Sequence, residues 1–578
     1  MPTLQFKGKN IIWNHHLSVP YHTLEEVSKL HFQPDKSNGN LIIEGDNLLA
    51  LKALLPMYAG KVKCICIDPP YNTGNEGWVY NDNANSPLIK DWLGKEVGKD
   101  DLTRHDKWLC MMTPRLKLLR ELLADDGVIC VNIDDNELHN LRNVINEVFG
   151  EENFRNFIII RRGIKSVQAQ FDTVDRLNYG AEYVVIYTKN SNYRFKKFEL
   201  ELEQERQSGW NNHWRGTDRP TMRYQLLGVT PETGQWRWGK ERSLRAIENY
   251  KEMLKDLNKP KNGITQEEID NWYLKKLEET GEELDLLRLS SAGKPEHYIP
   301  ISASKLASSL WADLKPNGNN QLKQLFGKKV FENPKSIDLI KRLINFIEGD
   351  SKDTIILDSF SGSGTTGHAV MDLNKENGGN RKFILVQMTE ATEKEPDKNI
   401  CKDITRERIK RAIEKYGYDS GFQYLRVGQP LDAETLLKGK LPEYKTFAKY
   451  VYYLCTGENL KISPDPSLPK SGNKTPPLKK GDEGGFLDKN ISAESHISEK
   501  KFFIGTFGKQ AIYLIYKQDY DALTKMALNL EFAEKIIADQ PDKKRIVYAP
   551  ACFLDEEYME AHQIEFVSIP YNLFQRKT

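Results

Sequence analysis

Apolar residues along this chain fall into short unbroken runs, separated by longer stretches in which apolar and polar positions are mixed. Runs of this length, rich in Val and Ile, predict strands that are buried on both faces of a parallel sheet. They lie at residues 64–67, 128–132, 157–161 and 183–187. Apolar side chains at helical spacing occur at residues 108–123, 137–148 and 337–348. This alternation predicts a doubly wound α/β sheet.

The most informative motif follows directly on the first of these runs. Asp68-Pro69-Pro70-Tyr71 succeeds residues 62–67, so we expect it in the crevice at the carboxyl end of a buried strand. The carboxylate and the Pro69 carbonyl can each accept a hydrogen bond from one exocyclic amine. Tyr71 offers a flat face on which a base can stack. The four residues fit an aromatic amine better than a hydroxyl or a thiol, but paired prolines that simply end a strand explain them equally well.

A second motif, Phe360-Ser-Gly362-Ser-Gly364, lies between an expected strand at residues 354–357 and an expected helix. Glycines at such a turn allow positive φ and a close approach of backbone to ligand, and the helix start presents N–H groups. The pattern predicts a nucleotide-type site. Its spacing toward Gly367 also matches the dinucleotide fingerprint, so the motif alone leaves the ligand open. A Walker phosphate loop is excluded because no Gly-Lys-Ser/Thr follows.

Together the two motifs resemble those of the amino-group DNA methyltransferases that use S-adenosylmethionine (SAM). Asp68 to Tyr71 is similar to the DPPY motif of that family, and Phe360 to Gly364 is similar to its FxGxG motif. Their order resembles the permuted β class. Longer strings resemble the modification (Mod) subunits of type III restriction systems, and they lie at residues 68–76, 104–116, 126–135 and 331–335.

The resemblance implies roles for further residues. Phe360, Gly362 and Gly364 would line the cofactor, and Asp358 would help to position its amino-acid end. Pro334 and Lys335 match a segment that lies against the methionine moiety in this class. Ser336 stands where the family pattern usually has a second proline.

Two acidic residues are further candidates for cofactor binding. Glu390, after the expected strand at residues 383–387, could hydrogen-bond the ribose hydroxyls, or it could be an acid in a solvent-facing loop. Asp46 could meet the adenine of the cofactor, or it could be the N-cap of the helix that follows, and the two roles are compatible.

Arginine and tryptophan are interleaved between the two motifs, in residues 208–245. Arginine reads guanine edges and phosphates, and aromatic rings stack on bases or wedge into a duplex. The resemblance places a target-recognition domain here; the alternative is a small module with tryptophans in its core and arginines at its rim. The candidate DNA-binding residues are Arg215, Arg219, Arg223, Trp236, Arg237 and Trp238.

Composition narrows the classes of protein to which this chain can belong. The net charge of +1 excludes a uniformly basic DNA-coating protein, so a DNA surface must be local. Seven cysteines in 578 residues predict neither a disulfide framework nor a metal site. The absence of a Pro-Cys dipeptide removes the cytosine-C5 methyltransferases. Without a membrane-spanning run or a signal-peptide core, the protein is expected in the cytoplasm.

We therefore expect a Rossmann-like methyltransferase core in permuted order, with an inserted target-recognition domain and a C-terminal α/β module. Residues 463–500, rich in Pro, Lys, Ser and Gly, are expected to be a flexible linker. The expected segments are an N-terminal extension (1–40), a DPPY half (41–195), the insertion (196–310), an FxGxG half (311–430), a helical segment with the linker (431–500) and an assembly module (501–578).

The predicted function is methylation of adenine N6 in double-stranded DNA, with the adenine flipped out of the stack. Asp68, rather than Ser, at the first motif position favours adenine over cytosine N4. The resemblance implies a homodimer, and DNA cleavage would need a helicase-nuclease (Res) subunit. The alternatives are a cytosine-N4 methyltransferase, a non-catalytic DNA-specificity subunit, a nicotinamide oxidoreductase, and a methyltransferase that acts on RNA or protein.

Overall fold

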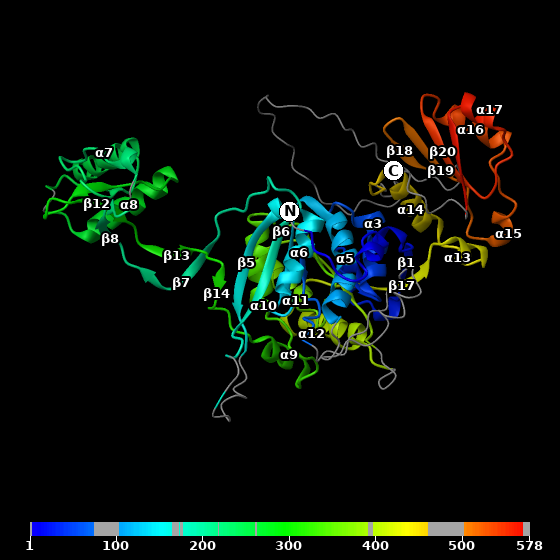
Figure 1. The fold of residues 1–578 in the computed structure, drawn as a ribbon, viewed down its shortest axis with the longest axis horizontal. Helices are drawn as coiled ribbons and strands as arrows, with labels where there is room; N and C mark the ends of the chain where they lie inside the picture. Colours follow the sequence, from blue (N-terminus) through cyan, green and yellow to red (C-terminus); the bar gives the residue numbers. More distant parts are fainter. Residues whose placement is uncertain are drawn as a thin grey trace. The chain divides into compact units, whose positions relative to one another are not determined.

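The computed structural model describes residues 3–73, 103–163, 173, 177–217, 219–260, 263–390, 397–460 and 502–569. The chain divides into two compact units (Figure 1). The large unit comprises residues 1–195 and 309–578, and the inserted unit comprises residues 196–308. The inserted unit occupies the part of the chain in which the sequence predicts an insertion.

A ten-stranded sheet forms the centre of the large unit. Its six consecutive strands from β17 to β4 run parallel, whereas β6 is antiparallel to both of its neighbours. In spatial order the strands are β1 (His22–Glu26), β17 (Gln423–Pro430), β2 (Leu41–Glu44), β16 (Lys382–Gln387), β15 (Ile355–Asp358), β3 (Val62–Ile67), β4 (Leu123–Ile133), β6 (Ala181–Thr188), β5 (Phe154–Arg161) and β14 (Leu310–Trp311).

The direction of the connections reverses between two central strands, β15 and β3. The chain leaves β15 toward β16 on one side, and it leaves β3 toward β4 on the other. In a doubly wound sheet such a reversal opens a crevice outside the carboxyl ends of the two strands. The doubly wound fold in permuted order is confirmed, since β3 precedes β15 in the chain but lies beside it in the sheet.

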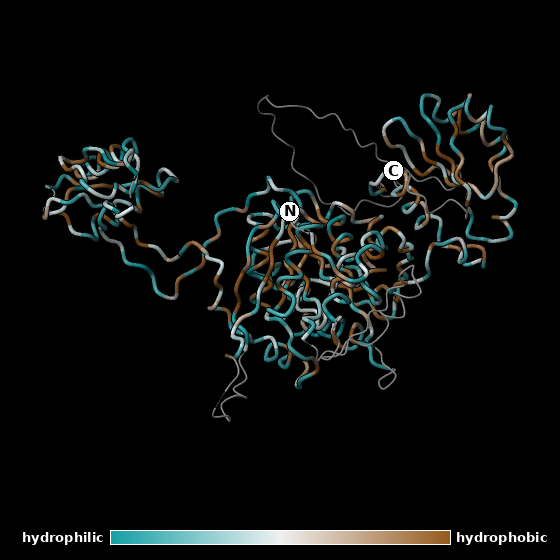
Figure 2. The backbone as a smooth tube through the Cα atoms, in the orientation of Figure 1, coloured by the Kyte–Doolittle hydropathy of each residue, from teal (hydrophilic) through white to brown (hydrophobic). Residues whose placement is uncertain are grey.

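Helices cover both faces of this sheet because successive strand residues point to opposite sides. On one face Ile65 and Ile67 share a core with α3 (Asn47–Tyr58), α5 (Arg104–Leu122) and α6 (Leu138–Phe149). On the other face Leu385 lies against Gly367 of α11 (Thr365–Asn377), and that glycine also faces α12 (Glu407–Tyr416). α11 also packs on α10 (Ile337–Glu348). Figure 2 shows that the strands of this sheet are strongly hydrophobic.

Short elements complete the N-terminal and middle parts of the large unit. They are α1 (Lys9–Ile12), α2 (His15–Ser18), α9 (Gly318–Phe326) and α13 (Ala433–Leu437). All seven cysteines are free, and Cys64 and Cys66 are buried in β3, as the sequence predicts. Among the residues that the structure describes, no helix is long and apolar enough to cross a membrane.

The C-terminal part of the large unit forms a second, four-stranded sheet. Its strands are β18 (Phe503–Phe507), β19 (Gln510–Leu514), β20 (Lys544–Ala549) and β21 (Ile564–Ser568), with α15 (Tyr520–Leu523), α16 (Leu530–Asp539) and α17 (Glu556–Ala561). This sheet packs on α14 (Tyr444–Thr456), where Tyr444 Oη donates to Leu514 O at 3.3 Å. The expected linker at residues 463–500 lies outside the described residues.

The inserted unit has its own small core, formed by Tyr250, Met253, Trp272 and Tyr298. Thr265 is the N-cap of α8 (Gln266–Thr280) and forms a capping box with Glu268. At the two ends of the segment β7 (Glu199–Arg206) pairs with β13 (Ser302–Leu306). Its other elements are β8 (Gly209–Asn212), β9 (Trp214–Arg215), β10 (Gln235–Trp236), β11 (Leu287–Leu289), β12 (Pro295–Ile299), α7 (Lys240–Asp256) and α8 (Gln266–Thr280).

Candidate active site

The segment Asp68 to Tyr71 directly follows β3, at the carboxyl edge of the sheet. Two prolines end the strand because they cannot donate to a neighbouring strand. The turn is fixed from two sides: Trp108 Nε1 donates to Pro70 O at 2.7 Å, and Asn132 Nδ2 donates to Ile67 O at 3.1 Å. No described residue donates a hydrogen bond to the Pro69 carbonyl. The helix α5 and the strand β4 therefore hold the turn.

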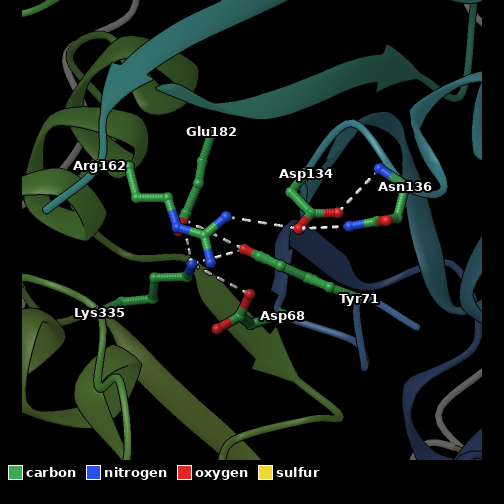
Figure 3. Close-up of polar contacts among 7 residues, drawn as sticks. All are labelled: Asp68, Tyr71, Asp134, Asn136, Arg162, Glu182 and Lys335. Carbon is green, nitrogen blue, oxygen red and sulfur yellow. Dashed lines mark hydrogen bonds and ion pairs between the residues drawn. The ribbon is translucent and has the colours of Figure 1, made fainter. Parts of the chain in front are cut away.

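Lys335 joins this turn to β6 (Figure 3). Its Nζ donates to Tyr71 Oη at 2.5 Å and to Glu182 Oε2 at 2.6 Å. The same Nζ lies 3.4 Å from Asp68 Oδ1. Three segments that are far apart in the sequence thus bring one ammonium, two carboxylates and a phenol together.

A second cation extends this cluster toward β4 and β5. Arg162 Nε lies 3.4 Å from Glu182 Oε1, and Arg162 Nη1 lies 3.5 Å from Asp134 Oδ2. Asp134 also accepts hydrogen bonds from the backbone N and the Nδ2 of Asn136, at 3.0 Å and 2.9 Å (Figure 3). Three carboxylates and two cations leave the cluster with one net negative charge when all are ionised.

Burial and neighbouring charges shift the protonation equilibria of the cluster. Burial raises the pKa of Asp68, and the Lys335 ammonium opposes this only in part. Burial acts to lower the pKa of Lys335, but Asp68 and Glu182 raise it overall. The pKa of Glu182 is lowered, because Lys335 and Arg162 outweigh its burial. Of the two carboxylates around Lys335, only Asp68 is thus shifted toward its neutral form.

The glycine turn follows β15 at the same edge of the sheet. Gly362 has φ +47° and Gly364 has φ +78°, a region that side chains other than glycine rarely adopt. A Cβ on Gly362 would lie 3.0 Å from the Phe331 ring. The N–H of Gly362 donates to Gln387 Oε1 at 2.7 Å. The backbone of this turn is therefore held in a shape that only glycine fits.

Asp358, the last residue of β15, braces the glycine turn from inside. Its carboxylate accepts hydrogen bonds from Phe360 N at 3.1 Å and from Thr366 Oγ1 at 2.6 Å. Burial raises the pKa of Asp358 to about 8. The residue lies where the sequence predicts it, and its contact with the amino-acid end of a cofactor stays a prediction.

Pro334 and Lys335 connect the two motifs. Thr365 Oγ1, beside the glycine turn, donates to Lys335 O at 3.3 Å. A Cβ on Gly318 would lie 2.0 Å from Pro334 O, so α9 packs tightly against the same backbone. The backbone of this segment therefore contacts the glycine turn, whereas the Lys335 side chain reaches Asp68. The sequence does not predict this second contact.

The two acidic candidates lie at the carboxyl ends of neighbouring strands. Glu390 has φ +58° and accepts a hydrogen bond from Gln387 Nε2 at 2.9 Å, and burial raises its pKa. Asp46 is the N-cap of α3, where its carboxylate accepts from Leu48 N at 2.8 Å and lies 3.3 Å from Arg115 Nη2. The N-cap role of Asp46 is thus observed, and the cofactor contacts of both residues stay predictions.

Glu182 lies outside every motif of the sequence, and Asp134 lies in the string 126–135, which gave it no role of its own. Glu182 stands near the start of the apolar strand β6, and this is the one sequence signal that could have marked it. An acidic residue next to a run that is buried on both faces needs a partner, but the sequence does not say which. Arg162, directly after β5, forms ion pairs with Asp134 and Glu182.

The candidate DNA-binding residues of the inserted unit divide into three kinds. Arg215 and Arg219 are exposed. Arg223 and Arg237 are half-buried and hold loops, since Arg223 Nε donates to Gly234 O at 2.9 Å and Arg237 Nε donates to Asn212 O at 3.1 Å.

The two tryptophans belong to the interior of the inserted unit. Trp236 is 2% exposed and its Nε1 donates to Tyr224 O at 2.7 Å, so its prediction as a DNA-binding residue is wrong for this conformation. The physical reason is that this small unit needs large apolar side chains for its core. Trp238 is half-buried beside His213, with the Arg242 guanidinium 4.5 Å from its ring.

Comparisons with known proteins agree with the geometry of the large unit. A model of the DNA methylase family, named for N6 and N4 methyltransferases, matches residues 62–426. The StyLTI Mod subunit, from a type III restriction-modification enzyme of Salmonella typhimurium, is 32% identical over 427 residues, with 68% of this chain and 61% of that protein covered. The EcoPI Mod subunit of Escherichia phage P1 is 32% identical over 448 residues, with 69% and 66% covered.

The chain spans about three fifths to two thirds of the length of these two relatives. A solved structure, titled as a putative DNA modification methylase from Thermus thermophilus complexed with S-adenosyl-L-methionine, is 13% identical with a TM-score of 0.30, over 68% of this chain and 99% of that one. The family match takes in more than half of the chain and includes Asp68 to Tyr71 and the glycine turn. The chain therefore belongs to the N6/N4 DNA methylase family.

Proposed function

We propose that this protein transfers a methyl group from SAM to the N6 amine of an adenine in double-stranded DNA. One observation carries the proposal: Lys335 joins the turn at Asp68 to the glycine turn, so that both motifs lie at one edge of the sheet. An amine acceptor and a nucleotide-type loop at neighbouring strand ends are the two halves that such a transfer needs. Membership in the N6/N4 family supports the same reaction.

The residues at this edge fit SAM, which is a nucleoside with a cationic sulfonium group. The turn at Gly362 and Gly364 lets a ligand approach the backbone closely. Glu390 follows β16 at this same edge, and we assign to it the ribose hydroxyls. The net negative charge of the Asp68 cluster favours a cation nearby. When bound, SAM supplies an electrophilic methyl group.

The chain's contribution is to hold and orient the amine. Asp68 and the Pro69 carbonyl accept the two N–H groups of one exocyclic amine, which directs the nitrogen lone pair away from the ring. Tyr71 provides a face for the flipped base, worth roughly 1–3 kcal/mol of stacking. Because the nucleophile is a neutral amine, positioning and charge placement account for most of the rate acceleration.

Adenine is the base that Asp68 favours. In the family that the sequence resembles, Asp at the first motif position goes with adenine more often than Ser does. Methylation of cytosine N4 is the alternative, because the same acceptors also fit the cytosine amine.

The similarity to Mod subunits suggests the biological context. We propose that the chain is the modification subunit of a type III restriction-modification system and acts as a homodimer. Cleavage of DNA would then depend on a separate Res subunit. The exposed Arg215 and Arg219, together with the half-buried Arg223 and Arg237, are the proposed DNA contacts of the inserted unit.

Transfer of tritium from methyl-labelled SAM tests the proposed function. The purified protein should label duplex DNA and leave RNA and bulk protein unlabelled. Labelling of RNA or protein in preference to DNA would contradict the proposal, as would binding of NAD without any transfer from SAM. DNA binding without transfer would identify a non-catalytic specificity subunit.

A further inference from the structure

We infer that Glu182 is a positioning residue: it draws the Lys335 ammonium away from Asp68 and so keeps the Asp68 carboxylate available to the target amine. The inference rests on the proposed function, because it assigns a role in the same amine-binding site. Glu182 belongs to neither of the two motifs and lies on β6, beyond β4 in the sheet.

The distances show how Lys335 is shared. An ammonium has three protons to donate. Two of them form short hydrogen bonds, to Glu182 Oε2 at 2.6 Å and to Tyr71 Oη at 2.5 Å. Asp68 Oδ1 stays at 3.4 Å and forms no hydrogen bond with a described residue. The ammonium therefore acts on Asp68 mainly through its charge and leaves Oδ1 as an acceptor.

This arrangement meets two opposing requirements. Asp68 must be ionised to accept a hydrogen bond from the amine N–H and to stabilise the developing positive charge, and burial opposes ionisation. A nearby cation favours the ionised form. A direct short ion pair, however, would occupy the oxygens that the amine needs. Glu182 resolves the conflict because it provides a stronger partner for Lys335 than Asp68 does.

Glu182 is itself held in place by a second cation. Arg162 Nε lies 3.4 Å from Glu182 Oε1, the oxygen that Lys335 does not contact, and Tyr71 Oη lies 3.4 Å from Glu182 Oε2. The side chains of Glu182 and Lys335 are each 15% exposed. A carboxylate that is buried between two cations stays ionised near neutral pH, as its lowered pKa indicates.

The charged and titratable groups that face Asp68 come from five parts of the fold. Tyr71 and Cys66 flank Asp68 in the sequence, Glu182 comes from β6, and Lys335 precedes α10. Asp358 ends the neighbouring strand β15. Asp134 acts on Tyr71. Lys335 is the cation among them that acts on Asp68. Removal of Glu182 should therefore lower the pKa of Asp68, and removal of Lys335 should raise it.

The experiment compares Glu182→Gln and Lys335→Met with the wild-type protein in the pH dependence of kcat/KM for DNA methylation. The activity of the wild-type protein should fall at low pH as Asp68 takes up a proton. In E182Q this acidic limb should move to lower pH, and in K335M it should move to higher pH, each by roughly one unit. The plateau of kcat in E182Q should also fall, by about tenfold or more, because Lys335 then pairs with Asp68.

A matched control separates this role from general stability. Glu348 and Arg381 form another buried ion pair, at 2.6 Å, near the amino end of β15. Glu348→Gln should lower the unfolding temperature but leave the acidic limb at its wild-type pH. SAM binding by E182Q, measured by calorimetry, should match that of the wild-type protein within about twofold.

Each result decides between the two proposals. Wild-type transfer to DNA with unshifted limbs in both variants would overturn the role of Glu182 and leave the proposed function standing. Full activity of E182Q would do the same. If the wild-type protein transferred no methyl group to DNA, the proposed function and this role would both be overturned. If E182Q failed to fold, Glu182→Ala would take its place and should move the acidic limb in the same direction.

Discussion

Charged side chains are largely buried at the carboxyl edge of the large sheet, whereas they are exposed on the surface of the inserted unit. At the edge, Lys335 and Glu182 are each 15% exposed, and they contact Tyr71 and Asp68. In the inserted unit, Arg215 and Arg219 are exposed. Burying a charge carries a large desolvation free energy, so a buried charge needs several partners, whereas an exposed charge stays hydrated and needs none.

Burial of an ion pair does not by itself distinguish the candidate active site. The pair Arg381–Glu348 is more deeply buried than any pair in the Asp68 cluster, yet it lies near the amino end of β15. What distinguishes the carboxyl edge is that carboxylates from separate strands converge on shared cations next to a glycine turn. In the inserted unit, by contrast, the arginines Arg215 and Arg219, which we propose as DNA contacts, are exposed.

The largest expected effect is at Asp68 itself. Asp68→Ala should reduce methyl transfer by about three orders of magnitude or more, because the amine loses its charged acceptor. Folding should be unaffected, since burial opposes the charge that is removed. Tritium transfer and thermal unfolding measure the two quantities. Asp125→Ala, an exposed residue of β4, is the control and should keep full activity.

A substitution at the glycine turn comes next. Gly362→Ala should weaken SAM binding by about tenfold or more, because the new Cβ meets the Phe331 ring and φ is positive. Gly417→Ala is the matched control: its φ is +63° and nothing lies within 4 Å of its Cβ. Both changes should cost roughly 1 kcal/mol of stability. Calorimetry should show weaker SAM binding for G362A and unchanged SAM binding for G417A. Equal SAM affinities of the two variants would contradict the assignment of the turn.

Arginine substitutions in the inserted unit test the other side of the comparison. Arg215→Ala and Arg219→Ala should each weaken DNA binding, and each should reduce the slope of log affinity against log salt by about one. Arg242→Ala should not, because Arg242 donates to both oxygens of Asp285, at 2.6 Å and 2.9 Å. Fluorescence anisotropy over a salt series measures this. An unchanged slope in both variants would place the DNA surface elsewhere.

The last expected effect is on stability and not on activity, and it is a pH dependence at Asp358. Its pKa is about 8 in the folded protein and about 4 in an unfolded chain, so the folded state keeps a proton that the unfolded state releases between these values. The free energy of unfolding should therefore fall as pH rises through this window, by up to ~1.4 kcal/mol per unit. Asp358→Asn should remove this dependence. Urea unfolding of both proteins over the window measures it, and parallel curves would contradict it.

The fold and the two motifs follow from the sequence because their signals are local. Apolar runs predict β3 and β4, and Gly362 and Gly364 predict a turn whose backbone needs positive φ. The contacts of Lys335 do not follow from the sequence. They depend on β6 lying two strands from β3, which no local pattern states. The richness of residues 208–245 in Arg and Trp did not separate DNA-binding residues from core residues, since Trp236 lies in the core of the inserted unit.

Mass spectrometry of nucleosides tests the central claim most directly. Duplex DNA that has been incubated with the purified protein and SAM should contain N6-methyladenine, and DNA incubated with the Asp68→Ala protein should contain none. Absence of any methylated base would contradict the proposed amine methyl transfer, and N4-methylcytosine in place of N6-methyladenine would contradict the choice of base.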